Sequence, residues 1–205
     1  MMKNRLILGL ILVSLNLLVA CSGNTPELAR ISRDAVILAF GDSLTHGTGA
    51  KLVDSYPAVL EKLSGHKVIN AGIPGELSEQ GLKRLPGLLE KHKPEMLILC
   101  HAGNDILRKR NLDHATSNLV QMIALAKKNN IEVILVGVPE PGLFLSSSKL
   151  YSSVAEQTNV LLIDDLLPEI LSDASLKSDP IHPNKEGYRI MAHTLMDIMK
   201  EAGAL

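Results

Sequence analysis

Aromatic residues are scarce in this sequence. They make up 2% of its 205 residues, and tryptophan is absent. A stacking platform for a polysaccharide chain is hard to build from so few rings, because such platforms depend on large flat side chains. The composition therefore argues against glycans as the main ligand.

An excess of charge of one sign is also missing. The formal net charge is −1, and the basic residues are scattered rather than gathered in a run. Nucleic-acid binding needs a concentrated basic surface, so this sequence argues against it. With 46% hydrophobic residues and no internal repeat, the chain is long enough for one compact domain with a substantial core.

Cysteine is limited to Cys21 and Cys100. Cys100 ends the apolar run Met96 to Cys100, where a small buried strand residue is expected rather than a reactive thiol. Cys21 follows a basic N-terminal region and an apolar stretch that is shorter than a typical transmembrane helix. This is the pattern of a secretory signal. The alternatives are a plain signal peptide or a signal anchor, with Cys21 incidental.

The stretch Leu18-Val-Ala-Cys21 resembles the lipobox of bacterial lipoproteins, in which the cysteine is acylated and becomes the first residue of the mature protein. This favours a signal peptide over residues 1–20, a lipidated tether over 21–33, and a folded domain over 34–205. Acylated Cys21 would anchor the protein to a membrane and leave Cys100 without a disulfide partner. Ser22 resembles a sorting residue for the outer membrane, so an exported, membrane-anchored lipoprotein is expected.

Short apolar runs alternate with helical patterns along the rest of the chain, which predicts a three-layer α/β/α fold with a parallel sheet of about five strands. Functional groups in such folds collect beyond the carboxyl ends of the strands. Strands are expected at Ala35 to Phe40, Val68 to Ile73, Met96 to Cys100, Val133 to Val138 and Val160 to Ile163. Helices are expected after Ser55, around Leu82 to Leu89 with a kink or restart at Pro86, and over Leu112 to Asn130, Ser146 to Thr158 and Asn184 to Ala202.

Ser43 stands just after the first expected strand, in the glycine-rich stretch AFGDSLTHGTG. A turn from strand into helix exposes a serine and supplies backbone donors, as a nucleophile requires. Gly-Asp-Ser is also an ordinary turn composition. A phosphate-binding loop is disfavoured, because the stretch has neither a Walker lysine nor the GxGxxG spacing.

A candidate partner for Ser43 lies near the C-terminus. Asp179 and His182 are three residues apart in a segment stiffened by Pro180 and Pro183, so the carboxylate could orient the imidazole as a base. Two further strand ends offer oxyanion donors, namely the N–H of Gly72 and the side-chain amide of Asn104. Each of these segments, taken alone, is also compatible with an ordinary turn or loop.

Together these segments resemble the GDSL, or SGNH, hydrolase family. Four blocks occur in its order: Gly41-Asp-Ser-Leu44, Gly72, Gly103-Asn-Asp105 and Asp179-Pro-Ile-His182. The likeness covers residues 35–201 and is greatest to the arylesterase, acyl-thioesterase and lysophospholipase branch. The chain has His101-Ala102 before the third block, where the branch usually has a glycine in place of the alanine. The difference could narrow the rim of the pocket, and His101 is expected to be structural rather than a second base.

The resemblance implies an esterase in which Ser43 is the nucleophile, His182 the base and Asp179 its orienter. It implies oxyanion donors at Ser43, Gly72 and Asn104, no metal or organic cofactor, and an ester, thioester or lysophospholipid substrate. Two alternatives remain: an O-deacetylase of cell-envelope carbohydrate with the same catalytic groups, and a non-catalytic ligand-binding lipoprotein. A loop with Leu143, Phe144 and Leu145 could line an acyl groove or pack into the core.

Overall fold

The computed structural model describes residues 26–142 and 145–205. The expected signal peptide and the acylated Cys21 lie outside the described residues, as do Leu143 and Phe144 of the expected acyl-groove loop. Within the described ranges, no helix has both the length and the apolar character needed to span a lipid bilayer.

The fold is built on five parallel strands in the order β2-β1-β3-β4-β5, as the apolar runs predicted. Their side chains are buried on both faces in the three central strands, which explains why those runs do not alternate with polar residues. The strands are β1 Val36–Gly41, β2 Lys67–Gly72, β3 Met96–Cys100, β4 Glu132–Val136 and β5 Leu161–Ile163.

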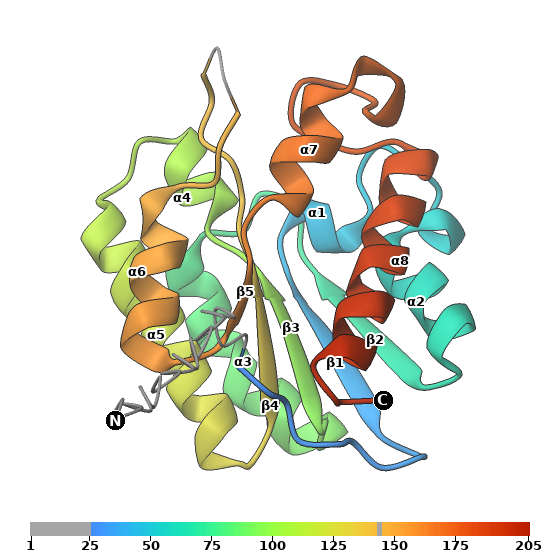
Figure 1. Ribbon diagram of the computed structural model, residues 1–205. Helices are drawn as coiled ribbons and strands as arrows, with labels where there is room; N and C mark the ends of the chain where they lie inside the picture. The colour runs from blue at the N-terminus through green and yellow to red at the C-terminus, as the bar shows by residue number, and fades with distance from the viewer. Residues whose placement is uncertain (1–25, 143–144) are drawn as a thin grey trace, which may run out of the picture.

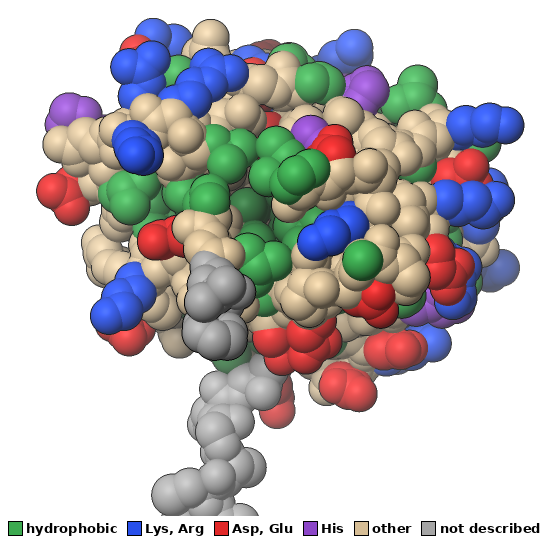
Figure 2. Space-filling view, turned by 90° about the horizontal axis from the view of Figure 1, so that it is seen from above, with side chains coloured by type: hydrophobic (Ala, Val, Ile, Leu, Met, Phe, Trp, Pro, Cys, Tyr) green, Lys and Arg blue, Asp and Glu red, His purple; other side chains and the backbone are tan. Residues whose placement is uncertain are grey.

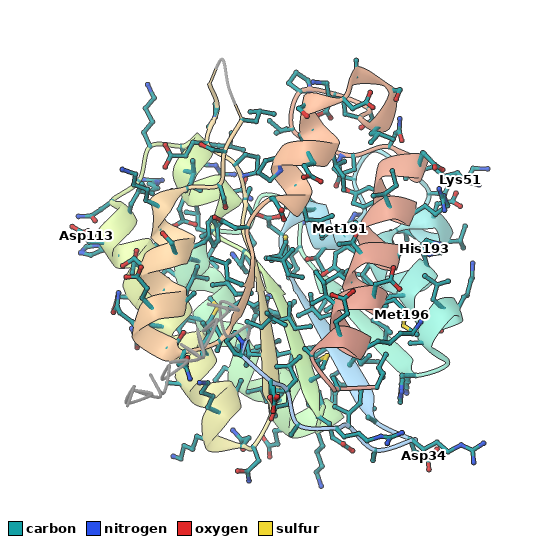
Figure 3. The ribbon with its side chains drawn as sticks, in the orientation of Figure 1. Asp34, Lys51, Asp113, Met191, His193 and Met196 are labelled. Atoms are coloured by element: carbon teal, nitrogen blue, oxygen red, sulfur yellow. The ribbon has the colours of Figure 1, made fainter. Side chains whose placement is uncertain are left out.

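Helices cover both faces of the sheet and complete the predicted three-layer architecture (Figure 1). Helices α2 (Tyr56–Ser64), α7 (Leu166–Ser172) and α8 (Lys185–Glu201) form one layer, and α3 (Ser78–His92), α5 (Leu112–Lys128) and α6 (Lys149–Thr158) form the other. On α8, Met191 is buried against the core while His193 is exposed (Figure 3).

Two features of the helices differ from the sequence prediction. Helix α3 does not restart at Pro86 but continues through it, and the buried Leu85 and Leu89 on either side of it supply the packing that offsets the missing backbone bond. The short helices α1 (Ser43–His46) and α4 (Gly103–Leu107) were not predicted. Both begin in motifs that follow predicted strands.

The folded domain begins earlier than residue 34, where the sequence placed its boundary. Leu28 and Ile31 are buried, and their N–H groups donate to the carbonyls of Ala202 and Ala204 just after α8. The segment therefore lies along the end of the sheet where the strands begin, near Asp34 (Figure 3). The carboxyl ends of the strands, where Ser43 is found, lie at the opposite end of the molecule (Figure 1).

Candidate active site

Ser43 is the first residue of α1, directly after the end of β1. Asp42 precedes it as the N-cap, and its Oδ1 accepts the N–H of Leu44 at 3.1 Å. Gly47 ends this single turn with φ 96°, a left-handed conformation that suits glycine. The sequence therefore places Ser43 on a tight strand-to-helix turn, with its own N–H free of any partner among the described residues.

Ser43, His182 and Asp179 form a continuous line of hydrogen bonds. The Ser43 Oγ lies 3.0 Å from His182 Nε2, and His182 Nδ1 lies 2.7 Å from Asp179 Oδ2. The residues come from opposite ends of the chain, 139 positions apart for the serine and histidine. The structure thus brings together the three side chains that the sequence singled out, at hydrogen-bond distances that suit proton transfer from Ser43 to His182 and orientation of the ring by Asp179.

The loop that carries Asp179 and His182 is held by its own hydrogen bonds. Asp179 Oδ1 accepts the backbone N–H groups of Ile181 and His182, both at 2.9 Å. Partial burial would raise the pKa of Asp179, but these bonds and the imidazole outweigh it and hold the pKa below its ordinary value. Asp179 therefore stays ionised to a lower pH than an ordinary aspartate and can stabilise an imidazolium on His182.

Asn104 joins this site from the start of α4. Its Nδ2 donates to Asp42 Oδ2 at 3.2 Å, so the amide is oriented by the residue next to Ser43. Asp42 is buried, and burial raises the pKa of its carboxyl, while nearby His101 and the bond from Leu44 act in the lowering direction. This orienting role of Asp42 was missed from the sequence. The available signal was its position between a strand end and the candidate nucleophile.

Gly72 does not join Ser43 and Asn104 at this site. Its N–H donates to Asn70 Oδ1 at 3.0 Å, and a Cβ built on it would lie 2.1 Å from the backbone nitrogen of His46. It lines a separate hollow with His46 and Ser55. The prediction of Gly72 as an oxyanion donor is therefore corrected: this glycine lets β2 pack closely against α1.

A pocket of about 600 Å³ opens beside Ser43 and His182 at the carboxyl end of the sheet. Figure 2 shows hydrophobic side chains gathered around a hollow in this face. Leu145 lines the pocket, in agreement with the groove interpretation of its loop, but His101 and Ala102 are fully buried and do not. These two residues therefore do not narrow the rim. The apolar lining comes from Leu44, Leu107, Val138, Pro139, Pro141, Leu145, Leu171, Pro180 and Ile181.

Within the described residues, no group of three or more His, Cys, Asp and Glu side chains is arranged to hold a metal ion. The chemistry that this arrangement can perform is attack by a serine hydroxyl on an acyl carbon, with imidazole as the base.

Comparison with known proteins gives the same result. The model of the GDSL-like lipase/acylhydrolase family matches residues 39–190, from the middle of β1 to the first half of α8. The chain belongs to this family. As a member of the GDSL-like acylhydrolases it is a hydrolase of carboxylic esters, and its fold is the SGNH hydrolase fold.

Several relatives share most of its length. An arylesterase of Vibrio mimicus is 32% identical over 73% of this chain and 80% of the relative. The thioesterase 1/protease 1/lysophospholipase L1 of Escherichia coli is 31% identical over 76% of this chain and 79% of the relative. The crystal structure of esterase EstA from Pseudoalteromonas has a TM-score of 0.72 and 25% identity, covering 82% of this chain and 98% of EstA.

Proposed function

We propose that this esterase works through an acyl-enzyme on Ser43, with His182 as the base and Asp179 as the residue that orients it. The observation that carries the proposal is the unbroken line from Ser43 Oγ through the His182 ring to Asp179 Oδ2, at 3.0 and 2.7 Å. His182 Nε2 accepts the serine proton as Ser43 Oγ bonds to the carbonyl carbon. The proton then passes to the departing alcohol or thiol, whose bond to the acyl carbon breaks.

The second half of the reaction repeats these steps with water. His182 removes a proton from a water molecule, the oxygen attacks the acyl carbon, and the bond to Ser43 Oγ breaks as the serine regains a proton from His182. The products are the free acid and the restored enzyme. Asp179 keeps its negative charge throughout and stabilises the imidazolium that forms in each half.

The negative oxygen of each tetrahedral intermediate needs donors, and we assign the Ser43 N–H, the Asn104 amide and the Gly75 N–H. Gly75 replaces Gly72 in this set. It lies in the loop after β2 with φ 78°, its N–H donates to no described residue, and Arg108 Nη2 holds its carbonyl at 3.0 Å. The bond to Arg108 ties the Gly75 loop to the end of α4, the helix that carries Asn104.

Replacing Asn104 with alanine is expected to lower kcat about 100- to 1,000-fold, because the transition state would lose one preorganised donor. KM should change less than kcat, since the amide matters most once the oxyanion has formed. Steady-state kinetics with p-nitrophenyl butyrate would measure both. The matched control is Asn129→Ala, at the C-terminal end of α5 and outside the pocket, which should keep full activity. An Asn104→Ala variant with wild-type kcat would remove Asn104 from the oxyanion site.

For the substrate, we propose esters or thioesters with an alkyl acyl chain, including lysophospholipids. The largely apolar pocket supports this class, as do relatives named thioesterase, lysophospholipase and arylesterase. Hydrolysis of p-nitrophenyl esters from acetate to palmitate is expected to peak at a chain longer than acetate, because added methylenes are buried against residues such as Leu171 and Ile181. A sharp preference for acetate would instead support the O-deacetylase alternative.

We also propose that the protein is an exported lipoprotein, anchored through Cys21 and favouring the outer membrane where the host has one. The lipobox-like sequence supports this. Metabolic labelling with an alkyne fatty acid should mark the wild-type chain and leave Cys21→Ser unlabelled, whereas equal labelling of both would contradict the proposal. Since residues 28–31 bind at the C-terminal end of α8, such an anchor would leave from the end of the domain opposite to Ser43.

A further inference from the structure

Three hydrogen-bonded polar side chains, two of them buried and one partly exposed, lie behind the pocket and do not line it. Arg84 of α3 donates through Nε and Nη2 to the two carboxylate oxygens of Glu76, each at 2.6 Å. Glu76 Oε2 in turn lies 3.0 Å from His101 Nε2. Glu76 is 6% exposed and His101 is fully buried, so neither can touch a substrate. The catalytic steps described above do not use these groups.

Arg84 joins the ends of two neighbouring strands. Its Nη2 donates to the carbonyl of Gly41 at 3.2 Å and to that of Ala71 at 2.8 Å, and its guanidinium lies 4.1 Å from the centre of the Phe40 ring. Gly41 is followed by Asp42 and Ser43, and Ala71 leads into the loop that contains Gly75. The guanidinium therefore fixes the end of β1 relative to the start of that loop.

His101 continues the chain to the element that carries Asn104. Its Nδ1 accepts the N–H of Ala102 at 2.7 Å, so Nε2 must carry the proton that is donated to Glu76. Ala102 has φ 74°, an unfavourable conformation for alanine, and it turns the chain into α4. Gly81 leaves the space for the imidazole, because a Cβ there would lie 2.4 Å from Nε2.

We propose that Arg84, Glu76 and His101 are positioning residues that hold the three oxyanion donors in register with one another. These three side chains connect the segments that carry Ser43, Gly75 and Asn104, which follow strands β1, β2 and β3 respectively. This inference rests on the proposed function of those donors. A shift of about 1 Å in the position of such donors can lower the rate about 100-fold. Removing hydrogen bonds among Arg84, Glu76 and His101 should therefore lower kcat while leaving KM nearly unchanged.

Two substitutions at His101 separate this role from general stability. Glutamine can extend an amide donor to the position of Nε2 and reach Glu76, whereas asparagine can replace only Nδ1 and leaves Glu76 without its third donor. We expect His101→Asn to lower kcat 10- to 100-fold and His101→Gln to stay within about threefold of wild type. Glu76→Gln removes the negative charge opposite Arg84 and should also lower kcat at least 10-fold.

The control is Glu61→Gln, which changes the carboxylate that accepts the Val68 N–H at the other end of β2. It should alter thermal stability only. Each variant is compared by kcat, KM and inhibition by an alkyl boronic acid, whose tetrahedral adduct fills the oxyanion site. Loss of boronate affinity in parallel with kcat is the expected result. Active sites are counted with a fluorophosphonate, so a poorly folded fraction does not lower the measured kcat.

The proposal would be overturned if His101→Asn and Glu76→Gln kept kcat per active site within twofold of wild type, or if Asn and Gln at position 101 behaved alike. Failure of the underlying function looks different. If the donor assignment were wrong, Asn104→Ala would keep wild-type kcat and boronate affinity. If Ser43 were not the nucleophile, the wild-type protein itself would show no labelling of Ser43 by the fluorophosphonate.

Discussion

Replacing Ser43 with alanine is expected to lower kcat/KM at least about 10,000-fold, because the nucleophile that forms the acyl-enzyme is removed. His182→Ala should cause a loss of similar size, since Ser43 Oγ would have no base within reach. The double variant should be little worse than either single one. Residues that act in one proton-transfer unit are not additive, and what remains is catalysis by the oxyanion donors and by binding.

The measurement is hydrolysis of p-nitrophenyl butyrate by the three variants and by two controls. The controls are Ser153→Ala on α6 and His193→Ala on the exposed side of α8, which make the same two changes at residues that do not line the pocket. Both should be fully active. If the free-energy losses of the two single variants added up in the double variant, Ser43 and His182 would not act as one proton-transfer unit. Substantial activity in Ser43→Ala alone would mean that another residue, or water, attacks the ester.

Asp179→Asn is expected to lower kcat about 1,000- to 10,000-fold while leaving the backbone almost unchanged. Oδ1 accepts two backbone N–H groups, so the oxygen of the asparagine must stay there. The NH2 group then faces His182 Nδ1 and turns it into an acceptor. The ring proton moves to Nε2, where it points at Ser43 Oγ, and the imidazole can no longer act as the base.

The matched control for this variant is Asp173→Asn. Asp173 Oδ1 also accepts a backbone N–H, from Ser175 at 2.7 Å, but this carboxylate does not contact His182. Its replacement should leave kcat unchanged. If Asp179→Asn were as active as Asp173→Asn, the carboxylate would have no part in orienting the imidazole.

The fold could be predicted from the sequence because its strands are short, its three central strands are apolar on both faces, and recognisable helical patterns separate them. The single-turn helices α1 and α4 could not, since four or five residues give too little periodicity to count. The continuity of α3 through Pro86 was missed for another reason. Local propensity favours a break there, and only the burial of Leu85 and Leu89 in the finished fold outweighs it.

The site was more predictable in its side chains than in its backbone groups. Ser43, His182 and Asp179 each lie in a short motif whose residue types and spacing predict its chemistry. A backbone donor has no such signature, and residue type alone does not distinguish Gly72 from Gly75, the glycine that we propose as the donor. Their φ values and the partners of their N–H groups distinguish the two glycines, and both depend on the three-dimensional arrangement.

The proposed positioning residues Arg84, Glu76 and His101 could not be recognised from the sequence for a similar reason. Arg84 and Glu76 are eight residues apart, but His101 joins them from the next strand, 25 residues beyond Glu76. The sequence did lead to a structural interpretation of His101. Its full burial and its bonds to Glu76 and Ala102 agree with that interpretation.

The most direct test of the mechanism is to trap the covalent intermediate. A protein that starts at Ser22 is mixed with excess p-nitrophenyl butyrate, quenched in acid within milliseconds, digested and mapped by mass spectrometry, beside Ser43→Ala. The account predicts one butyryl group, on the peptide that contains Ser43, formed with a burst of nitrophenol and absent from the variant. Acylation of a different residue, or rapid turnover without any covalent species, would contradict it.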